Sequence, residues 1–315
     1  MYMFIYLFMI IMLLISVAYL TLLERKILSY MQLRKGPNKV GFMGLLQPFS
    51  DGIKLFFSEQ VYLIFSNYII YMLSPMFMFS ISLFIWCLYP FIWNVVSMNY
   101  GFLFFLCCSS VGVYGLLLCG WSSNSNYSLL GSIRGVAQII SYEVSLVMVM
   151  ICFMIFTFGF NLLNLLGYQF YVWFMFFSLP LFFCWMSTCL AEVSRSPFDF
   201  AEGESELVSG FNIEYGGGGF ALIFLSEYGN IVFLSYLTSM IFLGCDLYNL
   251  MFYIKSTLIS FWFIWVRASL PRFRYDKLMY MTWKLFLPLS LNYFIFFLGF
   301  IFFVMVTGIY FIKFG

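Results

Sequence analysis

The sequence predicts an all-α polytopic membrane protein of about eight transmembrane helices. Hydrophobic residues make up 64% of the 315 positions and charged residues only 9%, with a mean hydropathy of +0.99. Soluble domains carry roughly 25% charged residues, so this composition belongs to the membrane class. The apolar residues also gather into stretches of about 20, the length that a helix needs to cross a bilayer. We predict one transmembrane domain over residues 1–315, with an interfacial amphipathic helix and structured loops.

Hydropathy sets the order of the predicted spans. The first apolar stretch lacks the basic start and small-residue cleavage site of a signal peptide, so we expect a retained helix. Asp246 and Lys255 fall in or beside the seventh stretch, which is the most polar of the set. The predicted spans lie near residues 2–23, 68–90, 101–120, 136–158, 171–191, 217–240, 247–266 and 286–312.

The basic residues predict the orientation of these spans. With eight crossings, thirteen of the fifteen Lys and Arg residues fall in loops on one side, and only Lys255 and Lys313 lie elsewhere. By the positive-inside rule, that side faces the cytoplasm or, in a mitochondrion, the matrix. Both termini are then predicted on the opposite side. The 44 Phe, 23 Tyr and 20 Met residues are typical of an AT-rich organellar genome.

The composition also limits the chemistry of the chain. Histidine is absent, which removes the usual metal ligand and the usual general base. None of the eight cysteines forms a Cys-x-x-Cys pair, so we expect no zinc or iron–sulfur site. No basic run indicates nucleic acid. Proton chemistry would therefore depend on carboxylates, tyrosines, lysines and water.

The first basic loop contains a predicted amphipathic helix. Residues 49–57 carry Phe and Ile at helical spacing, including Phe56, whereas Asp51 and Lys54 fall on another face. Such a helix lies in the plane of the membrane interface. It is either a structural anchor or the wall of an opening for an amphipathic, lipid-soluble substrate.

Acidic residues gather in and beside the membrane. Six of the thirteen acids lie between Glu192 and Glu214, where phenylalanines alternate with them. This segment is either a solvated loop or a loop packed against protein, and its phenylalanines favour the second reading. Glu143 lies inside the fourth predicted span, as a functional acid, as a partner of Arg134 or as a group that hydrogen-bonds to another helix.

Glu227 is the deepest acid, about ten residues inside the sixth predicted span. No Lys or Arg lies within a helical turn or two of it along the sequence, so another segment must compensate its charge or it must carry a proton. Ionisable residues at membrane depth are costly and are functional candidates by default. We therefore predict that Glu227 takes part in proton transfer.

The last basic loop, residues 267–277, carries four cations against one acid in its Arg267, Arg272, Arg274, Asp276 and Lys277. It is in part a positive-inside anchor. It could also complement the acidic segment or an anionic partner surface.

Taken together, these loops resemble the family of subunit 1 of respiratory NADH:ubiquinone oxidoreductase (complex I). The matches occur in family order over nearly the whole chain. The matching segments are Glu24-Arg-Lys, Gly36-Pro-Asn, Gly44-Leu-Leu-Gln-Pro, Ala137-Gln-x-Ile-Ser-Tyr-Glu143, Ala191-Glu192 with Arg195-x-Pro-Phe-Asp199, Glu202-Gly-Glu-Ser-Glu-Leu-Val-Ser-Gly-Phe-Asn-x-Glu-Tyr215, and Pro271-Arg-x-Arg-Tyr-Asp276.

The resemblance implies a multi-pass subunit of the mitochondrial inner membrane, with both termini on the intermembrane-space side. It implies ubiquinone as substrate, with no metal, flavin or iron–sulfur cluster bound by this chain itself. The implied partners are the peripheral-arm subunits that hold the quinone site and the terminal iron–sulfur cluster, neighbouring small membrane subunits, and membrane lipid. No complete active site would lie in this chain alone.

The resemblance also assigns two groups of site residues. One group would line or gate the ubiquinone chamber: Arg25, Arg34, Phe56, Phe220, Phe224 and Arg274. The other would form the acidic path toward the proton-pumping subunits: Glu143, Glu192, Asp199, Glu202, Glu204 and Glu227. The family usually has a proline and alanines where this chain has Gly216 to Gly219, so we expect a looser helix start there.

Two other functions are also compatible with the sequence. A related membrane-bound hydrogenase or antiporter-type complex has an anchor subunit of this architecture that need not handle quinone, and co-purifying chains would identify it. A stand-alone proton-coupled transporter would be active alone in liposomes. We find no repeat between the two halves of the chain, which disfavours the transporter.

Overall fold

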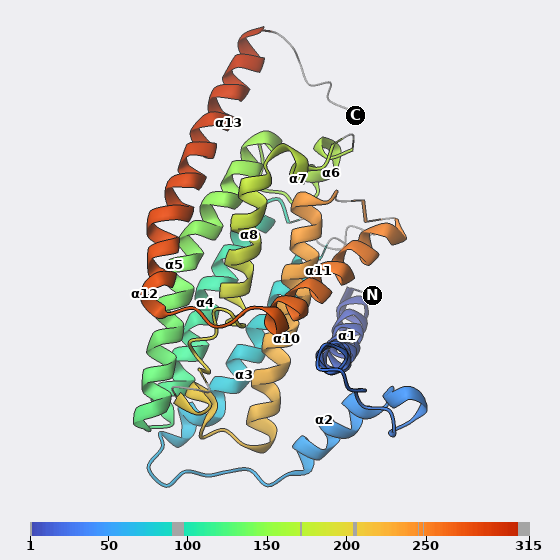
Figure 1. Ribbon diagram of the computed structural model, residues 1–315, viewed down its shortest axis with the longest axis vertical. Coiled ribbons are helices and arrows are strands. Elements are labelled where there is room, and N and C mark those ends of the chain that lie inside the picture. Colours follow the sequence, from blue (N-terminus) through green and yellow to red (C-terminus); the bar gives the residue numbers. More distant parts are fainter. Residues whose placement is uncertain are drawn as a thin grey trace.

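The computed structural model describes residues 2–89, 98–170, 172–203, 207–244, 246–247 and 249–307. These residues contain seven helices long and apolar enough to cross a membrane, together with a shorter apolar helix, Leu179–Glu192. They contain no β-strand. The predicted all-α polytopic membrane class is therefore confirmed. The helices, shown in Figure 1, are α1 (Tyr2–Met31), α2 (Gln47–Phe57), α3 (Tyr68–Ile85), α4 (Gly101–Ser122), α5 (Asn126–Thr157), α6 (Asn164–Tyr168), α7 (Phe174–Phe177), α8 (Leu179–Glu192), α10 (Gly217–Phe242), α11 (Leu250–Ser269), α12 (Tyr275–Tyr280) and α13 (Leu287–Thr307).

The centre of the fold is a bundle in which α10 and α5 are the most enclosed helices. Helix α10 packs against α3, α11 and α1, and α5 packs against α4, α13 and α8. Aromatic side chains fill the space between them, and Phe153, Trp185 and Phe242 are fully buried. Because lipid is as apolar as these side chains, close packing rather than exclusion from water holds the helices together.

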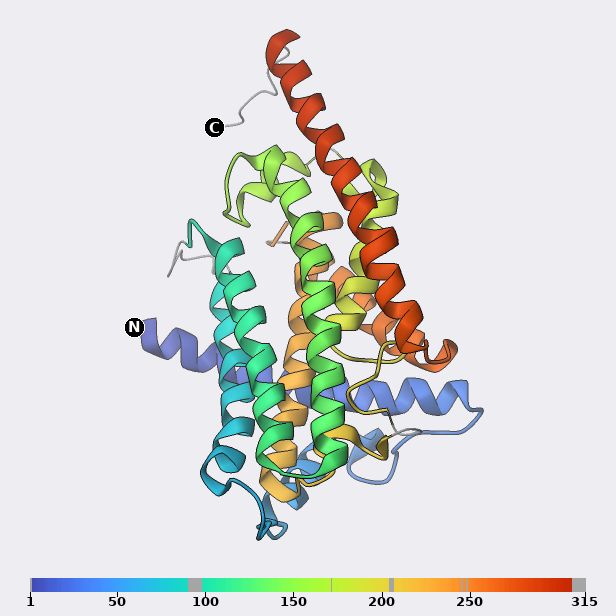
Figure 2. The same cartoon turned by 90° about the vertical axis from the view of Figure 1, so that its left-hand side faces the viewer.

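Helices α1 and α2 lie outside this bundle. Figure 2 shows α1 running across the bundle, whereas α3, α4, α5 and α10 run along its long axis. Helix α1 packs on α10, α11 and α2, and α2 also contacts α10. The predicted amphipathic helix is thus present as α2, with exposed Phe56 and Phe57 on its apolar face.

Two helices extend into segments that hydropathy assigned to loops. Helix α1 continues to Met31, past the predicted end at residue 23, so Glu24 and Arg25 are helical. Helix α5 begins at Asn126, ten residues before its predicted start, which makes Arg134 helical as well. The reason is that charged residues are compatible with helix geometry. Hydropathy detects where a helix leaves the lipid, not where it ends.

The fifth predicted span is interrupted in the structure. Residues 171–191 contain the single turn α7 and then α8, which is only 14 residues long. The break lies at Ser178, whose backbone is not helical, and Pro180 falls in the first turn of α8. Proline lacks the N–H needed inside a helix but fits its first turn, so it begins α8.

The last helical segment begins earlier than predicted. Apolar helix runs from Tyr275 through a π-helical turn, Met281–Phe286, into α13. In Figure 1, α13 rises from α12 past the upper end of α5. The predicted eighth span, 286–312, ends beyond the last described residue, 307.

Candidate functional site

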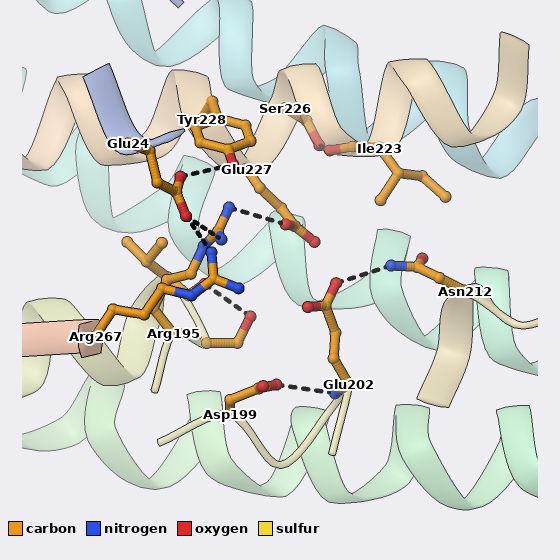
Figure 3. A network of polar contacts seen from close by, with 12 residues as sticks. Glu24, Arg195, Asp199, Glu202, Asn212, Ile223, Ser226, Glu227, Tyr228 and Arg267 are labelled. Carbon is orange, nitrogen blue, oxygen red and sulfur yellow. Dashed lines mark hydrogen bonds and ion pairs between the residues drawn. The ribbon is translucent and has the colours of Figure 1, made fainter. Parts of the chain in front are cut away.

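A cluster of charged side chains lies where α1, α10, α11 and the segment after α8 meet. Figure 3 shows Glu24 from α1, Arg195 from that segment, Glu227 from α10 and Arg267 pointing toward one another. Glu24 and Arg195 are both buried. Buried charges are stable only when paired, so this cluster specifies how four distant parts of the chain pack.

Arg195 is the central cation of the cluster. Its Nη1 atom lies 3.8 Å from Glu24 Oε1 and its Nη2 atom lies 3.7 Å from Glu227 Oε2. Its guanidinium also stacks over the Tyr228 ring, 4.7 Å from the centroid. Burial lowers the pKa of Arg195, but Tyr228, Glu227 and Glu24 outweigh that effect and raise it above its ordinary value. Arg195 therefore remains a fixed positive charge between two acids.

Glu24 is held by two further groups. Arg267 forms an ion pair with its Oε1 atom, and the Tyr228 hydroxyl donates a 2.7 Å hydrogen bond to its Oε2 atom. The Glu227 side chain, by contrast, has Arg195 as its only ion-pair partner among the described residues. The cation that Glu227 lacks along the sequence is thus supplied from the segment after α8.

The acidic segment folds back toward Glu227 instead of extending into solvent. Asn212 donates a 2.9 Å hydrogen bond to Glu202 Oε1, and the backbone N–H of Glu202 donates to Asp199 Oδ1 at 3.2 Å. Figure 3 shows the Glu202 carboxylate directed toward Glu227. Phe198 and Phe200 in this segment are buried, which agrees with a loop packed against protein.

Asp199 connects this segment to the last basic loop. Arg272 Nη2 lies 3.0 Å from Asp199 Oδ2, so that loop does complement the acidic segment. Burial raises the pKa of the Asp199 carboxyl, and the opposing effect of Arg272 does not cancel it.

A cavity of about 80 Å³ continues from the cluster into the bundle. Glu192, Glu227 and Asn230 line it, together with Ser109 of α4. Ser109 in turn donates a 3.1 Å hydrogen bond to Glu143 Oε1 on α5. Both Glu192 Oε2 and Asn230 Oδ1 are buried without a hydrogen-bond partner among the described residues. Most of the other residues that line the cavity are apolar. Two of the predicted acids, on α8 and α10, thus lie in its wall, and a third, on α5, accepts a hydrogen bond from Ser109 in that wall.

Comparison with known proteins supplies the decisive observation. A sequence model of the family described as NADH dehydrogenase matches residues 4–298. The chain belongs to the NADH dehydrogenase family.

Individual members of the family are similar over nearly their whole length. The chain is 60% identical to NADH-ubiquinone oxidoreductase chain 1 of Aedes aegypti, covering 93% of this chain and 94% of the relative. The corresponding protein of Locusta migratoria is 58% identical, with the same two coverages. That of Lampetra fluviatilis is 48% identical, covering 91% of this chain and 92% of the relative.

The family resemblance also assigned quinone-chamber residues, and the structure brings some of them together. Phe220 and Phe224 are in contact one helical turn apart on α10, with ring centroids 4.3 Å apart and ring planes tilted by 51°. A Cβ atom at Gly218 would meet Phe56 of α2 at 3.9 Å, so α2 makes a contact with the start of α10 two residues before Phe220.

The glycine quartet makes that contact possible. Gly217 has φ +57°, and a Cβ atom there would lie 3.0 Å from the carbonyl oxygen of Glu59. A Cβ atom at Gly216 would lie 2.8 Å from Val61 Cγ2. Only glycine fits this backbone shape and close approach easily. The helix start is tightly packed against the segment after α2, contrary to the expectation of a looser start.

The arginines of the chamber group lie elsewhere. Arg25 and Arg34 line a hollow of about 560 Å³ beside the end of α1, and Arg25 forms an ion pair with Asp51 of α2. Arg274 is exposed and lies 2.8 Å from Asp276 on its own segment. The remaining predicted residue, Glu204, lies outside the described residues.

Several residues of the cluster were not predicted from the sequence. Tyr228 gave no signal except its place beside Glu227. Along the sequence, Glu24 and Arg267 were evident only as charged loop residues. In the structure, Glu24 lies about three-quarters of the way along a 30-residue helix. No group of three or more His, Cys, Asp or Glu suited to a metal ion occurs in the part of the chain that the structure describes.

Proposed function

We propose that this chain is a core membrane subunit of proton-translocating NADH:ubiquinone oxidoreductase in the mitochondrial inner membrane. It would form part of the ubiquinone chamber and carry the acidic path that couples quinone reduction to proton pumping. Family membership and the names of the relatives support the enzyme assignment. Such a subunit would bind ubiquinone as substrate and assemble with peripheral-arm subunits, neighbouring membrane subunits and lipid, with both termini in the intermembrane space.

The observation that carries the coupling proposal is the cavity that joins the buried acids. Glu227 and Glu192 line it, and Ser109 links its wall to Glu143. A volume of about 80 Å³ is large enough for a few water molecules, since one water needs roughly 10–15 Å³ by this measure. Carboxyl groups and water in a confined space can pass protons by hydrogen-bond exchange, and histidine is absent from the chain.

Proximity of the quinone-chamber candidates to the acids supports the link between the two processes. Phe224 stacks toward Tyr228, whose hydroxyl holds Glu24, and Tyr228 lies directly beside Glu227. A change in charge near the Phe220–Phe224 face would therefore act on the Arg195 cluster within one or two helical turns. Coupling of this kind requires two states with different charge distributions.

Glu192→Gln and Glu227→Gln in the assembled enzyme test the proposal. We expect each variant to lower proton pumping and the quinone reduction coupled to it by at least about 100-fold, the lower end of the effect of losing a proton-transfer group. Asp246→Asn serves as the control, because its side chain is exposed and lies outside both groups of site residues. Normal quinone reduction and normal pumping in both glutamine variants would refute the acidic path.

A further inference from the structure

A buried glutamine holds the segment that carries Glu192 and Arg195. Gln138 of α5 is fully buried, and its Nε2 atom donates to the carbonyl oxygens of Ala191, at 2.9 Å, and Phe198, at 2.6 Å. One amide nitrogen therefore joins both ends of an eight-residue stretch, and the two oxygens are at most about 5.5 Å apart. Extended chain of that length would span roughly 25 Å.

We infer that Gln138 is a positioning residue that fixes Glu192 at the cavity wall and Arg195 between Glu24 and Glu227. We call its two hydrogen bonds the Gln138 clamp. The stretch 191–198 contains both charged residues, so loss of the clamp removes one hydrogen bond from each end of the stretch at once. The effect of the clamp on proton transfer rests on the function proposed above, whereas its effect on the segment does not.

The other contacts of residues 191–198 do not hold both ends of this stretch together. The Phe198 ring packs on Tyr142 and stacks on Phe273, which holds the far end of the segment laterally. The backbone N–H groups of Ser194 and Arg195 bond back to Ala191 and Leu190, which continues the end of α8. The clamp alone among these contacts ties the two ends of the segment to a single atom on α5.

The chain offers a matched control at the other end of α10. Gln169 is also buried, and its Nε2 atom donates to the carbonyl oxygens of Met240, at 3.0 Å, and Ile241, at 2.7 Å. It makes the same type and number of donor contacts, but these hold the end of α10 and not the acids. Its Oε1 atom also accepts a 2.7 Å bond from the Gly244 N–H, whereas Gln138 Oε1 has no partner among the described residues.

The experiment compares Gln138→Met with Gln169→Met in the assembled enzyme. Methionine keeps the side-chain length and removes both donors. The first readout is hydrogen–deuterium exchange of the backbone amides in 191–198, which we expect to be about tenfold faster in Gln138→Met only. Exchange within twofold of the wild-type rate in Gln138→Met would overturn the clamp. If this variant does not assemble, Gln138→Asn, which keeps the donors on a shorter side chain, takes the same test.

The second readout is the pH profile of ubiquinone reduction, which a purely structural role would not move. We expect Gln138→Met to shift the profile in the same direction as Glu192→Gln, and Gln169→Met to leave it unchanged. A shift in Glu192→Gln without one in Gln138→Met overturns the positioning role. Faster exchange in Gln138→Met, with unaltered profiles in both this variant and Glu192→Gln, supports the clamp and refutes the proposed acidic path.

Discussion

Replacing Arg195 by Met tests whether one buried cation holds the polar cluster together. The substitution removes the charge and keeps most of the side-chain length. It leaves Glu227 without its ion-pair partner and leaves Glu24 with the Arg267 ion pair and the Tyr228 hydrogen bond. The Arg195 and Glu24 side chains are only 10% and 7% exposed, so bulk water solvates these charges very little.

The distances set the expected magnitude. At an effective dielectric constant of about 20, each contact at 3.7–3.8 Å corresponds to roughly 4.5 kcal/mol of Coulomb attraction. Desolvation of the three charged groups offsets much of this in the intact cluster. Removing one partner of a buried pair nevertheless costs about 3–5 kcal/mol, because the remaining charge stays buried. We expect Arg195→Met to destabilise the folded chain by that amount.

The assay is thermal unfolding of the assembled enzyme, with Arg25→Met as the matched control. A loss of about 3–5 kcal/mol corresponds to a midpoint lowered by roughly 5–8 °C for a chain of this size. Arg25 also pairs with an acid, but its side chain is 52% exposed, and such pairs are worth about 0–1 kcal/mol. Adding Glu227→Gln to Arg195→Met should recover part of the loss, because the double variant no longer buries an unpaired Glu227 charge. The reasoning fails if Arg195→Met loses no more stability than Arg25→Met.

Three further predictions concern single contacts of the site. Tyr228→Phe removes the hydroxyl that donates to Glu24 and should cost about 1.5–3 kcal/mol in thermal unfolding; an unchanged midpoint would show that the bond contributes nothing. Gly217→Ala forces a side chain onto a backbone with φ +57° and should cost about 1–2 kcal/mol, whereas Gly167→Ala, where nothing lies within 4 Å of a new Cβ atom, should not destabilise the chain. Because burial raises the pKa of Asp199 above its ordinary value of 3.8, its contribution to stability is fully present below pH 3.8 and is lost as the pH rises through the raised pKa. Asp199→Asn should therefore flatten the pH dependence of the melting temperature just above pH 3.8, and parallel curves for both proteins would contradict the shift.

Hydropathy predicted the membrane class because lipid imposes a simple rule on composition and length. It did not predict where helices end, since that depends on local backbone geometry and on packing against protein. Helix α1 continues through Glu24 and Arg25 to Met31 because those side chains face protein partners, Arg267 and Asp51. Hydropathy averaged over a sequence window falls at these same charges, so it places the end of the predicted span there.

The acids of the site were predictable for a related reason, and their partners were not. An isolated carboxyl group in an apolar stretch is costly wherever it points, so Glu143 and Glu227 stand out along the sequence. Glu24 and Arg267 are 243 residues apart, and only the fold brings them together. Arg195 and Arg267 were interpreted as topology signals, and in the structure they also neutralise buried acids.

The acids that line or adjoin the cavity outnumber the cations near them. Glu24 and Glu227 share Arg195 and Arg267, whereas the described residues place no Lys or Arg at ion-pair distance from Glu143 or Glu192. Because the Arg195 side chain is carried by the segment that Gln138 holds, a shift of this segment would withdraw compensation from Glu227 and move Glu192 at the same time. The acids would then exchange protons through the cavity in response to a backbone movement. In the proposed mechanism, the charge of a single arginine would therefore link proton transfer to the position of the loop.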